Sequence, residues 1–99
     1  MTAYVCVLEI RLHVAASNSL KSKRKVVRSL KDLLRQRFGA AVAEIDGHDT
    51  WQSATLLCAL VGGSDTASRA DELERFVEAR CPGGCNFSRE TLSLADLCG

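Results

Sequence analysis

The 99 residues, 46% hydrophobic and 25% charged, have the length and composition of one small globular domain covering residues 1–99. No apolar run approaches the ~18–20 residues of a membrane span. The first ten residues also lack the basic and apolar regions of a secretion signal. We therefore expect a soluble, cytoplasmic protein without a membrane role.

The net charge of +1 conceals an uneven distribution. Residues 1–50 carry nine Lys and Arg against five Asp and Glu, whereas residues 51–99 carry four against seven. The excess comes from one stretch in which eight basic residues are interrupted by a single acidic one, Asp32. Such a concentration of one charge is the most informative electrostatic feature of the chain. The eight are Lys21, Lys23, Arg24, Lys25, Arg28, Lys31, Arg35 and Arg37.

Residues 4–14 alternate strictly between two faces, which predicts a β-strand. One face is apolar throughout, and the other grades from apolar to charged, as in a sheet with one solvated side. The first face holds Tyr4, Cys6, Leu8, Ile10, Leu12 and Val14, and the second holds Val5, Val7, Glu9, Arg11 and His13.

Residues 20–38 are predicted to form a helix, with Asn18 or Ser19 as its N-cap and Gly39 as its stop. Its apolar stripe consists of Val26, Val27, Leu30, Leu33, Leu34 and Phe38. Residues 40–46 predict a second strand. Residues 53–61 predict a third, which is apolar on both faces and therefore central.

A second helix is predicted to begin at Ser64 or Asp65, to bury Ala70, Leu73 and Val77, and to end before Pro82-Gly83-Gly84. Residues 86–94 are more polar and suit an edge strand. The order β-α-β-β-α-β indicates a ferredoxin-like α+β sandwich, with an antiparallel four-stranded sheet and two helices on one face. Right-handed crossovers place strands one and three in the centre.

The opposite face of this sheet would remain partly bare and apolar. We expect a homodimer or a protein partner there, because large exposed apolar patches mark interaction sites. Trp51 stands at a loop-to-strand junction, where packing on the core and an interface role are both open. The candidate interface residues are Val5, Val7, Trp51, Leu57 and Val61.

Three segments carry a family resemblance: Ser19-Leu20-Lys21-Ser22-Lys23-Arg24, Ala43-Glu44-Ile45, and Asp49-Thr50-Trp51-Gln52-Ser53-Ala54. With the opening strand Val7-Leu8-Glu9, they resemble the YlxP-like family of small bacterial proteins, a domain of unknown function, over about residues 4–94. The resemblance implies a ferredoxin-like fold. Genes of that family tend to lie near those for ribosome maturation and translation initiation, so it also implies a role near RNA or ribosomes.

An enzymatic interpretation finds little support in the residues. Glu9, Arg11 and His13 could form an acid–base cluster, but a solvated sheet face explains them equally. Asp46, His48 and Asp49 could ligate a metal, but an Asp- and Gly-rich turn needs none. Five cysteines without a secretion signal indicate free thiols, although Cys81 and Cys85 leave a redox or metal role open. We expect no catalytic residue, metal, cofactor or small-molecule substrate.

The leading hypothesis is a non-enzymatic RNA- or ribosome-associated protein that binds structured RNA, such as ribosomal RNA, through the first helix. Cations along a ridge match a phosphate backbone and confer affinity rather than sequence specificity. The alternative is a protein-interaction module that dimerises through the bare sheet face and has no nucleic-acid role. The candidate RNA-binding residues are Lys21, Lys23, Arg24, Lys25, Arg28, Lys31 and Arg35.

Overall fold

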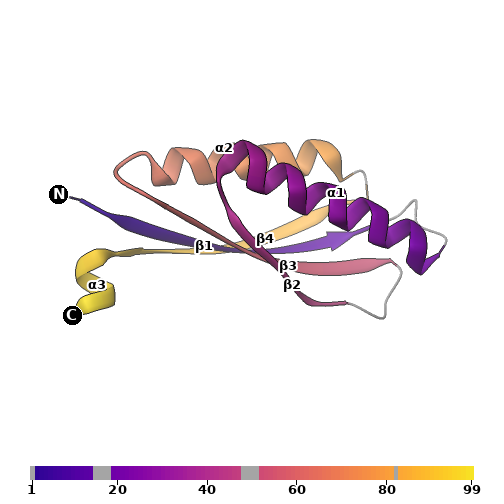
Figure 1. Cartoon of the computed structure of the whole chain (residues 1–99), viewed down its shortest axis with the longest axis horizontal. Helices are drawn as coiled ribbons and strands as arrows, with labels where there is room; N and C mark the ends of the chain where they lie inside the picture. The colour runs from indigo at the N-terminus through magenta and orange to yellow at the C-terminus, as the bar shows by residue number, and fades with distance from the viewer. Residues whose placement is uncertain (1, 15–18, 48–51, 82) are drawn as a thin grey trace.

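The computed structural model describes residues 2–14, 19–47, 52–81 and 83–99. The elements are β1 (Tyr4–His13), α1 (Leu20–Phe38), β2 (Ala41–Asp46), β3 (Ser53–Gly62), α2 (Thr66–Arg80), β4 (Cys85–Ser93) and α3 (Leu94–Cys98). The sheet has the order β2-β3-β1-β4, and each neighbouring pair is antiparallel. Figure 1 shows α1 and α2 together on one face of this sheet. The predicted ferredoxin-like architecture, with strands one and three in the centre, is therefore confirmed.

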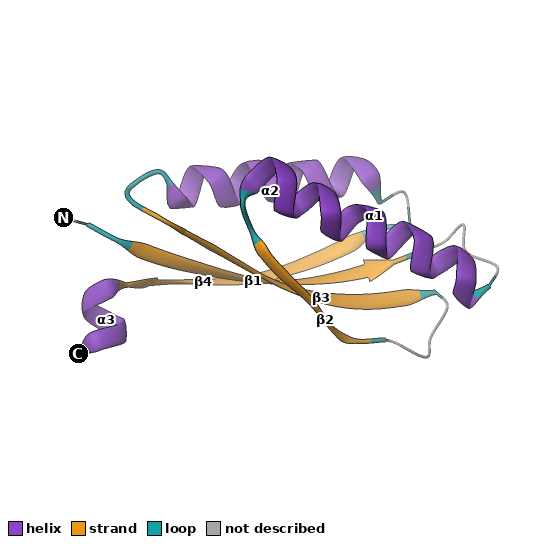
Figure 2. Cartoon of the chain, viewed as in Figure 1, coloured by secondary structure: helices purple, strands orange, loops and turns teal. Residues whose placement is uncertain are grey.

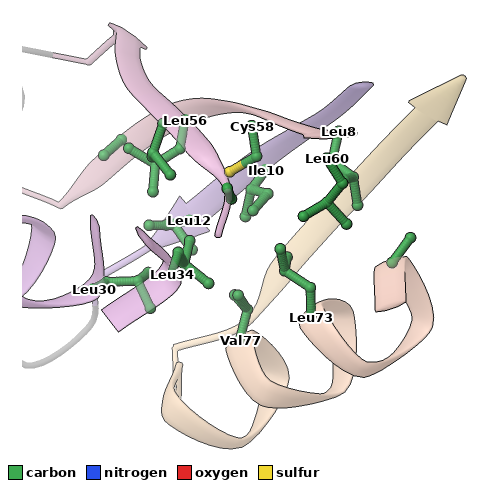
Figure 3. Packing of buried hydrophobic residues seen from close by; sticks show 14 of the residues in the cluster. Leu8, Ile10, Leu12, Leu30, Leu34, Leu56, Cys58, Leu60, Leu73 and Val77 are labelled. Atoms are coloured by element: carbon green, nitrogen blue, oxygen red, sulfur yellow. The ribbon is translucent and has the colours of Figure 1, made fainter. Parts of the chain in front are cut away.

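The core lies between the helices and the inner faces of β1 and β3. The predicted alternation of both strands is confirmed, because the register sets buried residues of one strand opposite buried residues of the other. Leu30 and Leu34 of α1 and Leu73 and Val77 of α2 point toward these strand residues and close the layer (Figure 3). The paired residues are Cys6 with Leu60, Leu8 with Cys58, Ile10 with Leu56 and Leu12 with Ala54.

Helix α1 has the predicted bounds because both of its ends are capped locally. The Ser19 hydroxyl accepts a hydrogen bond from the Ser22 backbone N–H at 3.1 Å. Gly39 ends the helix at φ 64°, a left-handed conformation that suits glycine. Within the described residues, no helix is both long and apolar enough to span a membrane.

The apolar stripe of α1 is narrower than predicted. Val27, Leu30 and Leu34 are buried, but Val26 is 48% exposed, so its assignment to the buried stripe was wrong. Steps of about 100° per residue turn Val26 well away from the centre of the stripe that the three buried residues define.

The short helix α3 was not predicted, and β4 lies one residue earlier than expected, at Cys85–Ser93. A capping box starts α3: Ser93 accepts from the Asp96 N–H at 3.1 Å, and Asp96 accepts from the Ser93 N–H at 2.9 Å. Hydrogen bonding of the Asp96 carboxylate to the Ser93 backbone N–H, and then to the Ser93 side chain, lowers the pKa of this carboxyl. Figure 2 shows α3 on the side of the sheet away from α1 and α2.

Candidate nucleic-acid interface

The exposed side of α1 carries a row of cations that we call the basic ridge: Lys21, Lys25, Arg28 and Lys31. Lys21, Lys25 and Arg28 are exposed and Lys31 is half-buried. None of the four forms an ion pair with an acidic residue in the described parts of the chain. Three of them line a shallow depression on the helix surface. The ridge therefore presents uncompensated positive charge to solvent.

Two further arginines of α1 reach down to the edge strand β2. Arg24 Nη1 lies 2.7 Å from Glu44 Oε1. Arg35 donates to the Val42 carbonyl at 2.8 Å and lies 3.6 Å from the exposed Asp32 carboxylate. These side-chain contacts hold α1 along β2. Arg24 and Arg35 remain in the candidate RNA-binding set, but part of their charge is already engaged by Glu44 and Asp32.

Lys23 does not belong to the surface predicted for RNA binding. Its side chain is fully buried, and its ammonium group donates to the Gly47 carbonyl and, at 3.1 Å, to the Ser53 carbonyl. The Glu44 carboxylate, itself 4% exposed, lies 3.6 Å away. Lys23 is spaced by four, seven and eleven residues from Val27, Leu30 and Leu34, and so falls on the buried stripe. That spacing was the signal that sequence reasoning missed.

The contacts of the Lys23 ammonium group bring together the three segments that carried the family resemblance. Lys23 lies in the first, Glu44 in the second and Ser53 in the third. Gly47 and Ser53 are the two ends of the β2–β3 connection, so one ammonium group holds both ends beside the first turns of α1. Trp51, His48 and Asp49 lie within this connection, outside the described residues.

The face of the sheet away from α1 and α2, here called the open face, carries four of the five candidate interface residues. Val5 and Val7 of β1 are half-buried, whereas Leu57 and Val61 of β3 are exposed. The register sets Val5 opposite Val61, while Val7 and Leu57 occupy adjoining rows. The structure thus brings these residues together.

The residues of the considered acid–base cluster have ordinary surface contacts. Arg11 Nη1 lies 2.5 Å from Glu9 Oε1, and Arg11 Nη2 donates to the Ser88 hydroxyl at 3.1 Å. Asp46, one of the three residues considered as metal ligands, accepts a hydrogen bond from the Gly47 N–H at 2.8 Å. No three His, Cys, Asp or Glu side chains are grouped as metal ligands within the described residues.

The cysteines are free thiols. Burial raises the pKa of the Cys81 thiol to about 11, with a further contribution from Cys85. Burial also raises the pKa of the Cys85 thiol, and Glu78 and Glu74 add to it. Both thiols therefore stay protonated at neutral pH, which disfavours nucleophilic chemistry at this pair.

Solved structures with similar folds share little sequence with this chain. The de novo designed protein Foldit4 has a TM-score of 0.53 at 10% identity, over 91% of this chain and 96% of that one. A de novo design with a ferredoxin fold has a TM-score of 0.46 at 12% identity, covering 88% and 83%. Ribosomal protein S6 of the 30S subunit of Thermotoga maritima has a TM-score of 0.42 at 11% identity, covering 92% and 89%. These likenesses concern the fold alone.

The chain matches none of the curated proteins with which it was compared. A family described as "Protein of unknown function (DUF503)" matches residues 5–84. This description does not carry the name YlxP-like, so the match confirms the resemblance only as far as a family of unknown function. Because the match covers most of the sequence, the chain belongs to the DUF503 family.

Proposed function

We propose that this protein binds structured RNA, ribosomal RNA being the expected class, through the basic ridge of α1. The observation that carries the proposal is the ridge itself: four cations within eleven residues of one helix, without an ion pair to a described acidic residue. Lys21 and Lys31 are separated by ten residues, or about 15 Å along the helix axis. The ridge can therefore contact several phosphates of one strand.

The ridge costs helix stability, which argues that it serves more than solubility. Lys21 and Lys25 are four residues apart, and Arg28 stands three residues from each of Lys25 and Lys31. Like charges at these spacings destabilise a helix by a few tenths of a kcal/mol per pair. Helix α2, by contrast, interleaves acidic and basic residues over its exposed side.

The arrangement favours phosphate contacts over base reading. Lys and Arg on a convex helix contact phosphate oxygens, which position a protein on nucleic acid without reading sequence. Recognition of RNA would then depend on the shape of the folded RNA and on where the charges of α1 meet it. The resemblance to a family whose genes lie near those of ribosome maturation supports ribosomal RNA as the first target to test.

The test is a binding titration of labelled ribosomal RNA fragments by fluorescence anisotropy, between 50 and 300 mM salt. We expect affinity to fall steeply with salt, because binding releases counterions from the phosphates. The variant Lys25→Gln/Arg28→Gln should bind more weakly and flatten the log–log salt slope by about 1.5, at slightly less than one unit per lost contact.

The matched control is Arg75→Gln/Arg80→Gln, which removes the same charge from α2 and should change affinity much less. Equal losses of RNA affinity in the two variants would show that binding depends on net charge in general and not on the basic ridge. Absence of RNA binding at 50 mM salt would contradict the proposal and favour the alternative, an interaction module without a nucleic-acid role.

A further inference from the structure

The open face combines large and small apolar side chains in successive rows across the sheet. The row at the start of β1 is formed by Leu92, Val5 and Val61. The next two rows contain three alanines, Ala41, Ala43 and Ala59, on the β2 side. Val61 is 68% exposed, the highest value among the large hydrophobic residues of the described chain. The large side chains thus raise one end of the face, and the small alanine side chains lie beside it on the β2 side.

Helix α3 extends the raised end of this face. It lies on the same side of the sheet as the open face (Figure 1). The Leu94 N–H donates to the Ala3 carbonyl at 2.9 Å, which ties the start of α3 to the chain just before β1. Leu94 and Leu97 are 52% and 53% exposed, and α3 buries none of its own residues. Covering the two leucines would add apolar burial to the hydrogen bonds that already hold this short helix.

The charges of the open face do not suit a polyanion. Arg11 is the single Lys or Arg on this face among the described residues, and it is paired with Glu9. Glu90 stands in the row of Val7 and adds negative charge. A phosphate backbone would therefore find repulsion rather than attraction here, whereas a nearly neutral apolar surface fits. The open face and the basic ridge must serve different occupants.

We propose that the open face binds a second copy of this chain, in a two-fold symmetric dimer with α1 and α2 of both copies on the outside. A two-fold axis makes an interface self-complementary, so the raised end of one copy meets the alanine rows of the other. Four strands about 4.8 Å apart, with central strands about 33 Å long, give a face on the order of 500 Å² in projection. Side-chain relief and α3 enlarge it toward the about 800 Å² per partner of a standard interface.

This size has a consequence for the strength of association. An interface at the lower end of the standard range, with few charged contacts, gives a reversible dimer rather than an obligate one. We therefore expect a dissociation constant in the micromolar range. In such a dimer both basic ridges face outward, so dimerisation does not require the RNA-binding proposal and would not block it.

The experiment is sedimentation equilibrium of the full chain from about 1 μM to 1 mM, with two matched variants. Val61→Lys places a charge on the open face, at a side chain that contributes little to the core. Val26→Lys is the control, because it makes the same change at an exposed valine of α1. We expect the unmodified chain to dimerise, Val61→Lys to weaken dimerisation at least tenfold, and Val26→Lys to leave it unchanged.

A monomer throughout the concentration range overturns the proposal, as does equal weakening by the two variants. Circular dichroism verifies that each variant is folded. Concentration-dependent amide shifts in ¹H–¹⁵N spectra of the unmodified chain supply a second measurement without any substitution. They should map to β1, β2, β3 and α3, and shifts confined to α1 or α2 would place the dimer contact elsewhere.

Discussion

Replacing Lys23 by Met tests whether this lysine is a structural anchor rather than a surface cation. The ammonium group donates to the carbonyls of Gly47 and Ser53 and is paired with Glu44 at 3.6 Å, with no exposed side-chain surface. Methionine keeps most of the apolar stem but leaves the two carbonyls without this donor. An unsatisfied buried acceptor costs about 1–3 kcal/mol, so we expect a loss of about 3 kcal/mol for the two carbonyls together.

The complementary substitution at the other partner, Glu44→Gln, should lower the free energy of unfolding by about 3–5 kcal/mol, the loss typical when a buried charge loses its partner. Lys23 would then hold a buried ammonium beside a neutral amide. The double variant Lys23→Met/Glu44→Leu removes both charges, so its cost should fall below the sum of the two single losses by at least about 2 kcal/mol. Arg24, the other partner of Glu44, is partly exposed, so water can solvate its guanidinium group when Glu44 is replaced.

Urea unfolding followed by circular dichroism measures these free energies, and a small domain with about 5–15 kcal/mol of stability leaves room for losses of this size. The matched control is Lys25→Met, the same change on the exposed side of α1, which should stay within about 0.5 kcal/mol of the unmodified chain. Equal stability of the two Met variants, or strictly additive losses in the double variant, would refute the anchor role of Lys23.

Two further perturbations probe Cys58, which is buried beneath the helices, and Arg69, a half-buried residue of α2. Burial raises the pKa of the Cys58 thiol to about 12, against the opposing charge of Arg35. The unfolded thiol ionises near 9.0, so stability is fully present below pH 9 and falls between pH 9 and 12, by up to about 1.4 kcal/mol per pH unit. Urea unfolding at several pH values should give Cys58→Ala a shallower fall, and identical slopes would contradict the burial of this thiol. Arg69 donates to the Phe38 and Val61 carbonyls at 2.7 and 3.0 Å. Arg69→Met should therefore lower the free energy of unfolding by about 2 kcal/mol. Arg69→Lys should lose less of this stability than Arg69→Met, but it should not match the unmodified chain, because lysine lacks the guanidinium fork. An effect no larger than that of Arg75→Met would speak against this role.

The regular elements could be predicted because each rests on local chemistry. Strict alternation in residues 4–14 and the two apolar faces of residues 53–61 indicated central strands, and the structure buries one side of both strands beneath the helices. The helix at 20–38 was placed to the residue because a serine cap and a glycine stop bracket it. The end of the chain was less accessible, since the capping box of Ser93 and Asp96 is a short signal that the neighbouring polar strand obscured.

The candidate sites could likewise be predicted where they depend on local periodicity, and could not where they depend on distant residues. The row of cations on α1 follows from helix periodicity, and the apolar row of Val5 and Val7 follows from the two-residue alternation of a strand. What escaped sequence reasoning is the role of a residue whose partners are distant. Lys23 looked like one more member of a basic stretch, because composition counts charges and takes no account of where each side chain points.

The sequence by itself determined the fold class of this protein: an α+β fold with a two-faced sheet, a helix that is basic on its exposed side and an apolar stripe beneath it. These properties depend on residues within a few positions of one another, where capping and periodicity act. Only the tertiary structure decided which groups pair with these cations, and therefore which cations remain available to a partner. Lys23 is removed from the surface because the fold brings Glu44, Gly47 and Ser53 around its ammonium group, and a buried charge persists only where such partners meet it.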